Sequence, residues 1–137
     1  MSAVEDRLEA MCERMGVKLI ERPDLRVDLN ACWHADSRSI VVRWGLDPVT
    51  RRCAIAHELG HADAGHDCSS PRAEREADEF AAKLLIDYDE VERIAHESGW
   101  APSEICAELG VTPDLFEVWS RLYEAGKIDM YSWCRIY

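Results

Sequence analysis

The stretch that decides the fold is His57-Glu58-Leu59-Gly60-His61. Two histidines four residues apart lie one above the other on one face of a helix, so both imidazoles can reach one metal ion. The glutamate between them leans toward the same pocket. The pattern indicates a zinc hydrolase, provided that another residue supplies a third ligand. Two unrelated histidines on a helix surface are the alternative.

The residues on either side of the motif predict the ends of its helix. Asp47-Pro48 marks the start, because aspartate caps free amides and proline fits the first turn. Gly65 marks the end. One stripe of the helix carries mostly small side chains, which predict close contact with another element: Val49, Cys53, Ala56 and Gly60.

His66 stands five residues after His61, just beyond the expected helix end. The third histidine of metzincins comes six residues after the second, and a glycine comes three after it, where this chain has Ala64. We therefore interpret His66 as a residue at the helix end or at the rim of the pocket, with a ligand role as the alternative.

The third ligand is expected from the next helix, which begins at Ser70-Pro71. One stripe of that helix mixes acids with apolar residues: Glu74, Ala77, Asp78, Ala81, Leu84 and Leu85. A core helix would place aliphatic residues where Glu74 and Asp78 stand, so these acids need a partner. We predict that Glu74 completes a His, His, Glu metal site and that Asp78 orients a histidine. Local capping or salt bridging is the alternative.

The opposite face of this helix has a simpler explanation. Its charged residues form i,i+4 pairs that are typical of a solvated surface: Arg72, Arg75, Glu76, Glu79 and Lys83. The pairing of Arg72 with Glu76 predicts no role for Glu76 in the site.

The two helices together resemble the ImmA/IrrE family of zinc metallopeptidases. The HELGH segment at 57–61 is followed by EREADEFAAKLL at 74–85, and the family has an E-x-x-A-N/D-x-F-A-x-x-L-L helix at that place. The resemblance covers roughly residues 16–90. It implies a gluzincin-like, intracellular protein of bacteria, phages or mobile elements. Many members cleave or inactivate a helix-turn-helix repressor.

The resemblance also implies roles for individual residues. His57, His61 and Glu74 match the ligands of one zinc ion per chain, Glu58 matches the general base, and Asp78 matches the carboxylate behind a ligand. Zinc would polarise a peptide carbonyl and make water acidic, while Glu58 takes the water proton and delivers it to the leaving amine.

The residue that stabilises the oxyanion is left open by the sequence. Tyr88, His96 and His66 are all candidates.

Composition indicates one soluble domain. The chain has 137 residues, 47% of them hydrophobic and 31% charged, without a run of eighteen apolar residues. The polar N-terminus predicts a cytoplasmic protein with no membrane segment. Six cysteines without a C-x-x-C pair favour reduced thiols. A net charge of −11 argues against nucleic acid and favours a basic partner or peptide.

The predicted fold is a mainly helical, zincin-like α+β domain with a small N-terminal sheet and a C-terminal helical pair. We expect a single domain over residues 1–137, with a core at about 16–98 and a helical extension at about 100–137. An amphipathic helix at 3–15 precedes short strands near 17–20 and 25–29, and a hairpin pairs 31–34 with 39–44. A further helix ends near Gly99.

The C-terminal pair, 102–109 and 114–124, resembles a helix-turn-helix and raises the alternative of a DNA-binding regulator. Acids dominate its surface, so we expect it to pack on the core or receive a partner. The aromatic tail at 127–137 should dock on the domain or on another protein, self-association included. A second alternative is a regulatory protein, such as an antirepressor or toxin-antitoxin component, that captures its partner without cleavage.

Overall fold

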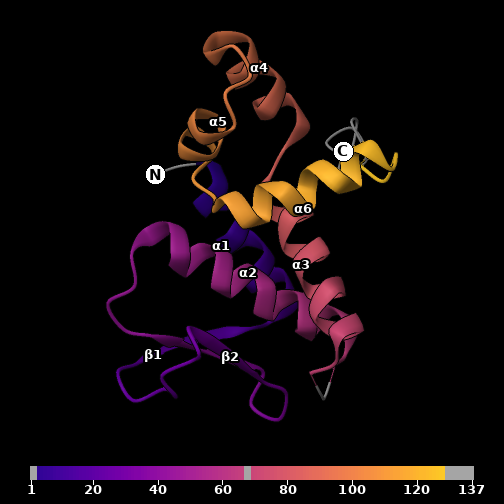
Figure 1. Cartoon of the computed structure of the whole chain (residues 1–137). Helices are drawn as coiled ribbons and strands as arrows, with labels where there is room; N and C mark the ends of the chain where they lie inside the picture. Colours follow the sequence, from indigo (N-terminus) through magenta and orange to yellow (C-terminus); the bar gives the residue numbers. More distant parts are fainter. Residues whose placement is uncertain (1–2, 67–68, 129–137) are drawn as a thin grey trace.

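The computed structural model describes residues 3–66 and 69–128. Within these residues it contains six helices and three strands, in this order: α1 (Ala3–Met15), β1 (Lys18–Arg22), β2 (Ala31–His34), β3 (Ser39–Arg43), α2 (Pro48–Ala64), α3 (Pro71–Leu85), α4 (Tyr88–Ser98), α5 (Pro102–Leu109) and α6 (Pro113–Glu124). The predicted mainly helical α+β class is confirmed. Figure 1 shows the sheet below α2 and helices α4 to α6 above it, so α2 lies in the middle of the molecule.

The sheet has the strand order β1-β3-β2. β1 runs parallel to β3, and β2 pairs with β3 as the antiparallel hairpin that the sequence predicts. Ile40 and Val42 of the central strand are fully buried. One face of the sheet therefore packs against α2 through apolar side chains. β2 is the edge strand that lies beside the motif helix.

The prediction of a strand at residues 25–29 is wrong, because this segment is a loop. The guanidinium of Arg43 donates hydrogen bonds to the backbone carbonyls of Leu25, Arg26 and Leu29. These carbonyls are therefore engaged by one side chain instead of by a neighbouring strand. Val27 is 98% exposed, so the alternation of apolar and charged residues here does not mark a buried face.

Both ends of α2 form as the sequence predicts. The side chain of Asp47 accepts a hydrogen bond from the Thr50 amide at the first turn. Gly65 ends the helix in the left-handed conformation at φ 69°. The buried face differs from the expected stripe, because Ile55 and Leu59 are fully buried with Ala56 whereas Val49 and Cys53 are only half-buried.

α2 and α3 cross in very close contact at Gly60. A Cβ atom at this position would lie 2.7 Å from the Cα of Ala77 and 3.1 Å from the Cβ of Phe80. The backbone of α3 thus lies directly against the motif helix, which confirms the close contact that the small residues predict. This contact brings the first turns of α3 within reach of the motif histidines.

The C-terminal helices pack on the core. Leu115, Trp119 and Leu122 of α6 are buried, and α6 crosses α3. Arg52 of α2 is also buried, where it pairs with Glu5 of α1 at 2.7 Å and donates to the Gly110 carbonyl at 2.7 Å. This arginine connects α1, α2 and the turn between α5 and α6. The aromatic tail lies mostly outside the described residues, so its docking stays a prediction.

No helix within residues 3–66 and 69–128 is long and apolar enough to cross a membrane. Cys12, Cys32, Cys53 and Cys106 are free thiols, as predicted, and the other two cysteines lie outside the described residues.

Candidate metal centre

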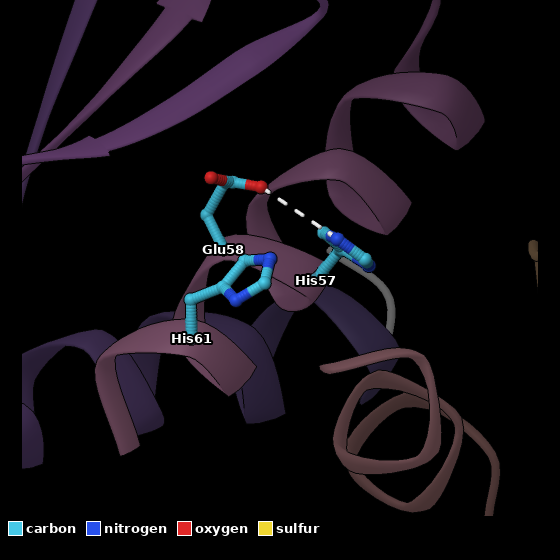
Figure 2. Close-up of side chains that lie close together, drawn as sticks. All are labelled: His57, Glu58 and His61. Atoms are coloured by element: carbon cyan, nitrogen blue, oxygen red, sulfur yellow. Dashed lines mark ion pairs between the residues drawn. The ribbon is translucent and has the colours of Figure 1, made fainter. Parts of the chain in front are cut away.

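The motif residues converge on one point at the surface of α2. Figure 2 shows the side chains of His57, Glu58 and His61 on two successive turns of the helix. Each offers one ligand atom, and these three atoms lie within 4.8 Å of one another. The His57 and His61 side chains are 21% and 11% exposed, so the site lies just below the surface.

The carboxylate of Glu74, from the neighbouring helix α3, lies close to both histidines. Its Oε2 atom lies 2.6 Å from Nε2 of His61, and its Oε1 atom lies 3.4 Å from Nε2 of His57. Oε2 is buried, and its contact with Nε2 of His61 is a hydrogen bond only while that ring nitrogen carries a hydrogen. When Nε2 carries no hydrogen, the buried oxygen lacks a donor, which is costly, and a cation bound by this oxygen and the two ring nitrogens would satisfy it. His57, His61 and Glu74 are therefore candidate ligands of a metal ion.

Asp78 lies one turn after Glu74 and holds His57. Its Oδ1 atom is 2.7 Å from Nδ1 of His57. Burial acts to lower the pKa of His57, but the hydrogen bond and charge of Asp78, helped by Glu58 and Glu74, outweigh it and raise the pKa. With Nδ1 engaged by a carboxylate, Nε2 of His57 is the nitrogen left for a metal.

Glu58 lies beside the two motif histidines with one of its oxygens already engaged. Oε1 accepts a hydrogen bond from the backbone amide of Trp33 in β2 at 2.9 Å, and Oε2 lies 3.9 Å from Nε2 of His57 (Figure 2). Burial raises the pKa of Glu58 to about 6, against the lowering effects of His57 and the Trp33 amide. A carboxylate with a pKa near neutrality is suited to accept and release a proton. The contribution of Trp33 was not predicted, because backbone amides leave no trace in a sequence.

His61 has its own hydrogen-bonded neighbours. Its Nδ1 atom lies 3.0 Å from Nδ1 of His66, and Nε2 of His66 lies 3.0 Å from Oε2 of Glu76. Burial lowers the pKa of His61, which favours the neutral ring that a metal ion needs. His66 therefore lies at the helix end beside the site.

The interpretation of Glu76 as a surface residue was incomplete. Its ion pair with Arg72 is present at 3.0 Å, as predicted. The same carboxylate also accepts a hydrogen bond from His66 through its other oxygen. The i,i+4 pairing concealed this second contact. The position of His66 after the helix-ending Gly65 was the only available signal.

The structure places Tyr88 and His96 in other surroundings. Tyr88 stacks on Tyr123 of α6, with ring centroids 5.7 Å apart. His96 lies on α4 near Glu92 and packs edge-on against Trp100. Among the described residues, neither side chain forms a hydrogen bond, ion pair or ring contact with the motif histidines.

A cavity of about 260 Å³ adjoins His57 on the side of α2 that faces α6. Its walls come from the loop before β2, from α2 and α3, and from α6 with its N-cap: Asn30, Thr50, Cys53, Ala54, His57, Asp78, Thr112, Asp114, Leu115 and Val118. Clefts for whole small molecules usually measure about 300–1,000 Å³. This cavity has the size for a side chain of a larger ligand.

A helix with two metal-binding histidines, met by a glutamate from the next helix, is an arrangement found in metallopeptidases. The chain belongs to the family of IrrE N-terminal-like domains, peptidase family M78, which it matches over residues 12–118. The matched region includes the site and reaches into α6. No curated protein sequence matches the chain.

Ten chains of solved structures match this chain, among them a transcriptional regulator and a metallopeptidase zymogen. A Mycobacterium tuberculosis transcriptional regulator superposes with a TM-score of 0.64 at 24% identity, over 87% of this chain. The match covers 40% of the regulator, so this chain spans less than half of its length, and the likeness is one of fold alone. The metallopeptidase zymogen of Pyrococcus abyssi abylysin gives a TM-score of 0.41 at 23% identity, over 70% of this chain and 95% of that one.

Proposed function

We propose that the protein is a zinc-dependent endopeptidase with His57, His61 and Glu74 as the metal ligands. The observation that carries the proposal is the approach of one carboxylate to both histidines: Glu74 Oε2 lies 2.6 Å from Nε2 of His61, and Glu74 Oε1 lies 3.4 Å from Nε2 of His57. Two imidazoles and one carboxylate are a usual ligand set of catalytic zinc, which keeps a further position open. Zinc, when bound, supplies Lewis acidity that polarises a peptide carbonyl and makes water a nucleophile near neutral pH.

Glu58 is the general base in this proposal. Its Oε1 atom is held by the Trp33 amide, so the carboxylate is fixed in position while Oε2 remains available on the side of His57. A pKa of about 6 lets Glu58 accept a proton from water and later release it to the leaving amine. Asp78 keeps the His57 ring in the orientation that presents Nε2.

The proposed substrate is a basic regulatory protein such as a helix-turn-helix repressor. DNA-binding proteins are rich in Lys and Arg, and this chain carries a net charge of −11. Opposite net charges accelerate the encounter of two proteins. The cavity beside His57 would hold a side chain of the substrate, with Leu115 and Val118 as its apolar wall.

Glu58→Gln tests the proposed activity. Glutamine keeps the size of the side chain and removes the base, so metal content should persist while proteolysis falls by at least ~10². Unfolded casein and a purified repressor encoded beside the gene serve as substrates, and cleavage is followed by mass spectrometry. Cleavage at the wild-type rate would show that Glu58 is not the base. Tight binding of the repressor without cleavage by wild type would favour partner capture.

A further inference from the structure

We infer that His66 and Glu76 are positioning residues that hold His61 ready to bind the metal. The inference rests on the proposed metal site and adds two residues to it. His57 contacts a carboxylate directly through Asp78, whereas His61 reaches one only through a second imidazole. The ring centroids of His61 and His66 are 5.2 Å apart at an interplanar angle of 69°. The two ring planes are steeply inclined to each other, and their Nδ1 atoms lie 3.0 Å apart.

The hydrogen-bond roles in this chain of groups determine each tautomer. An ionised Glu76 only accepts, so Nε2 of His66 carries the hydrogen of their 3.0 Å contact. Nδ1 of a neutral His66 is then an acceptor, and Nδ1 of His61 must donate across the other 3.0 Å contact. A neutral His61 with hydrogen on Nδ1 has a bare Nε2. This is the nitrogen that lies 2.6 Å from Glu74 Oε2.

Local backbone geometry places His66 where the chain of hydrogen bonds requires it. Gly65 adopts the left-handed conformation and turns the chain back over the end of α2. The backbone amide of His66 then donates to the carbonyl of His61 at 3.0 Å. The backbone bond fixes the position of His66 beside His61, and the contact between the two Nδ1 atoms then orients the His61 ring.

The side chains from His66 through Glu76 to Arg72 become steadily more exposed to solvent. The His66 side chain is 17% exposed and that of Glu76 is 39% exposed, whereas Arg72 at the outer end is 82% exposed. An ion pair at such an exposed arginine contributes little. Glu76 therefore acts mainly by accepting the hydrogen of His66, and Arg72 is dispensable.

Metal affinity of the purified protein measures this role without any substrate. Zinc dissociation constants are determined by competition with a chromophoric chelator for wild type, His66→Ala, Glu76→Ala and the double variant. Loss of a partner behind a metal-binding histidine costs about 10–100-fold in affinity, so each single variant should weaken zinc by roughly 10-fold or more. Because Glu76 acts through His66, the double variant should bind no more weakly than His66→Ala. Arg72→Ala and Glu79→Ala are the controls that should match wild type.

A conservative variant separates positioning from general damage to the fold. Asparagine at position 66 keeps an oxygen acceptor near the place of Nδ1, so His66→Asn should recover part of the affinity that His66→Ala loses. Long-range ¹H–¹⁵N spectra of the zinc-loaded protein should show His66 protonated at Nε2 and His61 protonated at Nδ1. Thermal unfolding of the metal-free variants shows that each is folded.

The outcomes distinguish this inference from the proposed function. A wild-type protein that binds no zinc would contradict the metal site itself. Wild-type zinc binding that His66→Ala leaves unchanged would overturn the positioning role alone. Additive losses in the double variant, or His66 protonated at Nδ1, would also overturn it.

Discussion

Gly60 of α2 lies so close to Ala77 of α3 that a Cβ atom on the glycine would come within 2.7 Å of the Ala77 Cα and 2.8 Å of its carbonyl oxygen. Glu74 and Asp78 stand on either side of Ala77 along α3. The distance between the two helices at this crossing therefore sets how far both carboxylates lie from the motif histidines.

Gly60→Ala should destabilise the protein and weaken its metal binding. Alanine in place of glycine inside a helix normally stabilises by about 1 kcal/mol, but here the methyl group meets backbone that can only shift away. Overpacking of this kind costs about 1–3 kcal/mol, so the net sign is reversed. Thermal unfolding and zinc titration measure the two effects. Asp63→Ala, on the exposed side of the same helix, should change neither. A more stable Gly60→Ala protein with wild-type metal affinity would refute the crossing argument.

Asp78→Ala should weaken metal binding by about 10–100-fold while leaving all three proposed ligands in place. The reason is the 2.7 Å contact with Nδ1 of His57, which holds the ring so that Nε2 faces Glu74. Chelator competition gives the affinity, and Glu79→Ala, the adjacent acid, is the matched control. Equal affinity of the two variants would mean that the contact does not orient His57.

Ala54→Phe should raise KM for a protein substrate without removing metal. Ala54 lines the cavity beside His57, and the larger ring would occupy space that we assign to a substrate side chain. A change in binding that is the same for ground and transition states raises KM at constant kcat, here by roughly 3–10-fold. Ala64→Phe, at the exposed end of α2, is the control. An unchanged KM would place the substrate elsewhere.

Local signals in the sequence predicted much of this structure. The caps of α2 depend on Asp47, Pro48 and Gly65, which act within one turn of their own position. Glu74 and Asp78 could be singled out because acids interrupt an apolar stripe of α3. Both signals are readable without any knowledge of the tertiary fold.

The parts that sequence reasoning missed depend on contacts between distant segments. The loop at 25–29 has the alternation of a strand, but the guanidinium of Arg43 takes up its carbonyls. The i,i+4 ion pair with Arg72 explains why an acid stands at position 76. The contact between Glu76 and His66 becomes apparent only in the folded chain, where His66 lies over the end of α2. In both cases hydrogen bonds from a side chain outside the segment, which the local pattern does not reveal, determine the structure.

The central claim is that Glu74 completes a metal site with His57 and His61. Elemental analysis of purified wild type, Glu74→Ala and Glu79→Ala tests it most directly, because it counts metal per chain independently of substrate. The account predicts one zinc per chain in wild type and in Glu79→Ala, and far less than one in Glu74→Ala. Full metal content in Glu74→Ala, with cleavage activity retained, would contradict it.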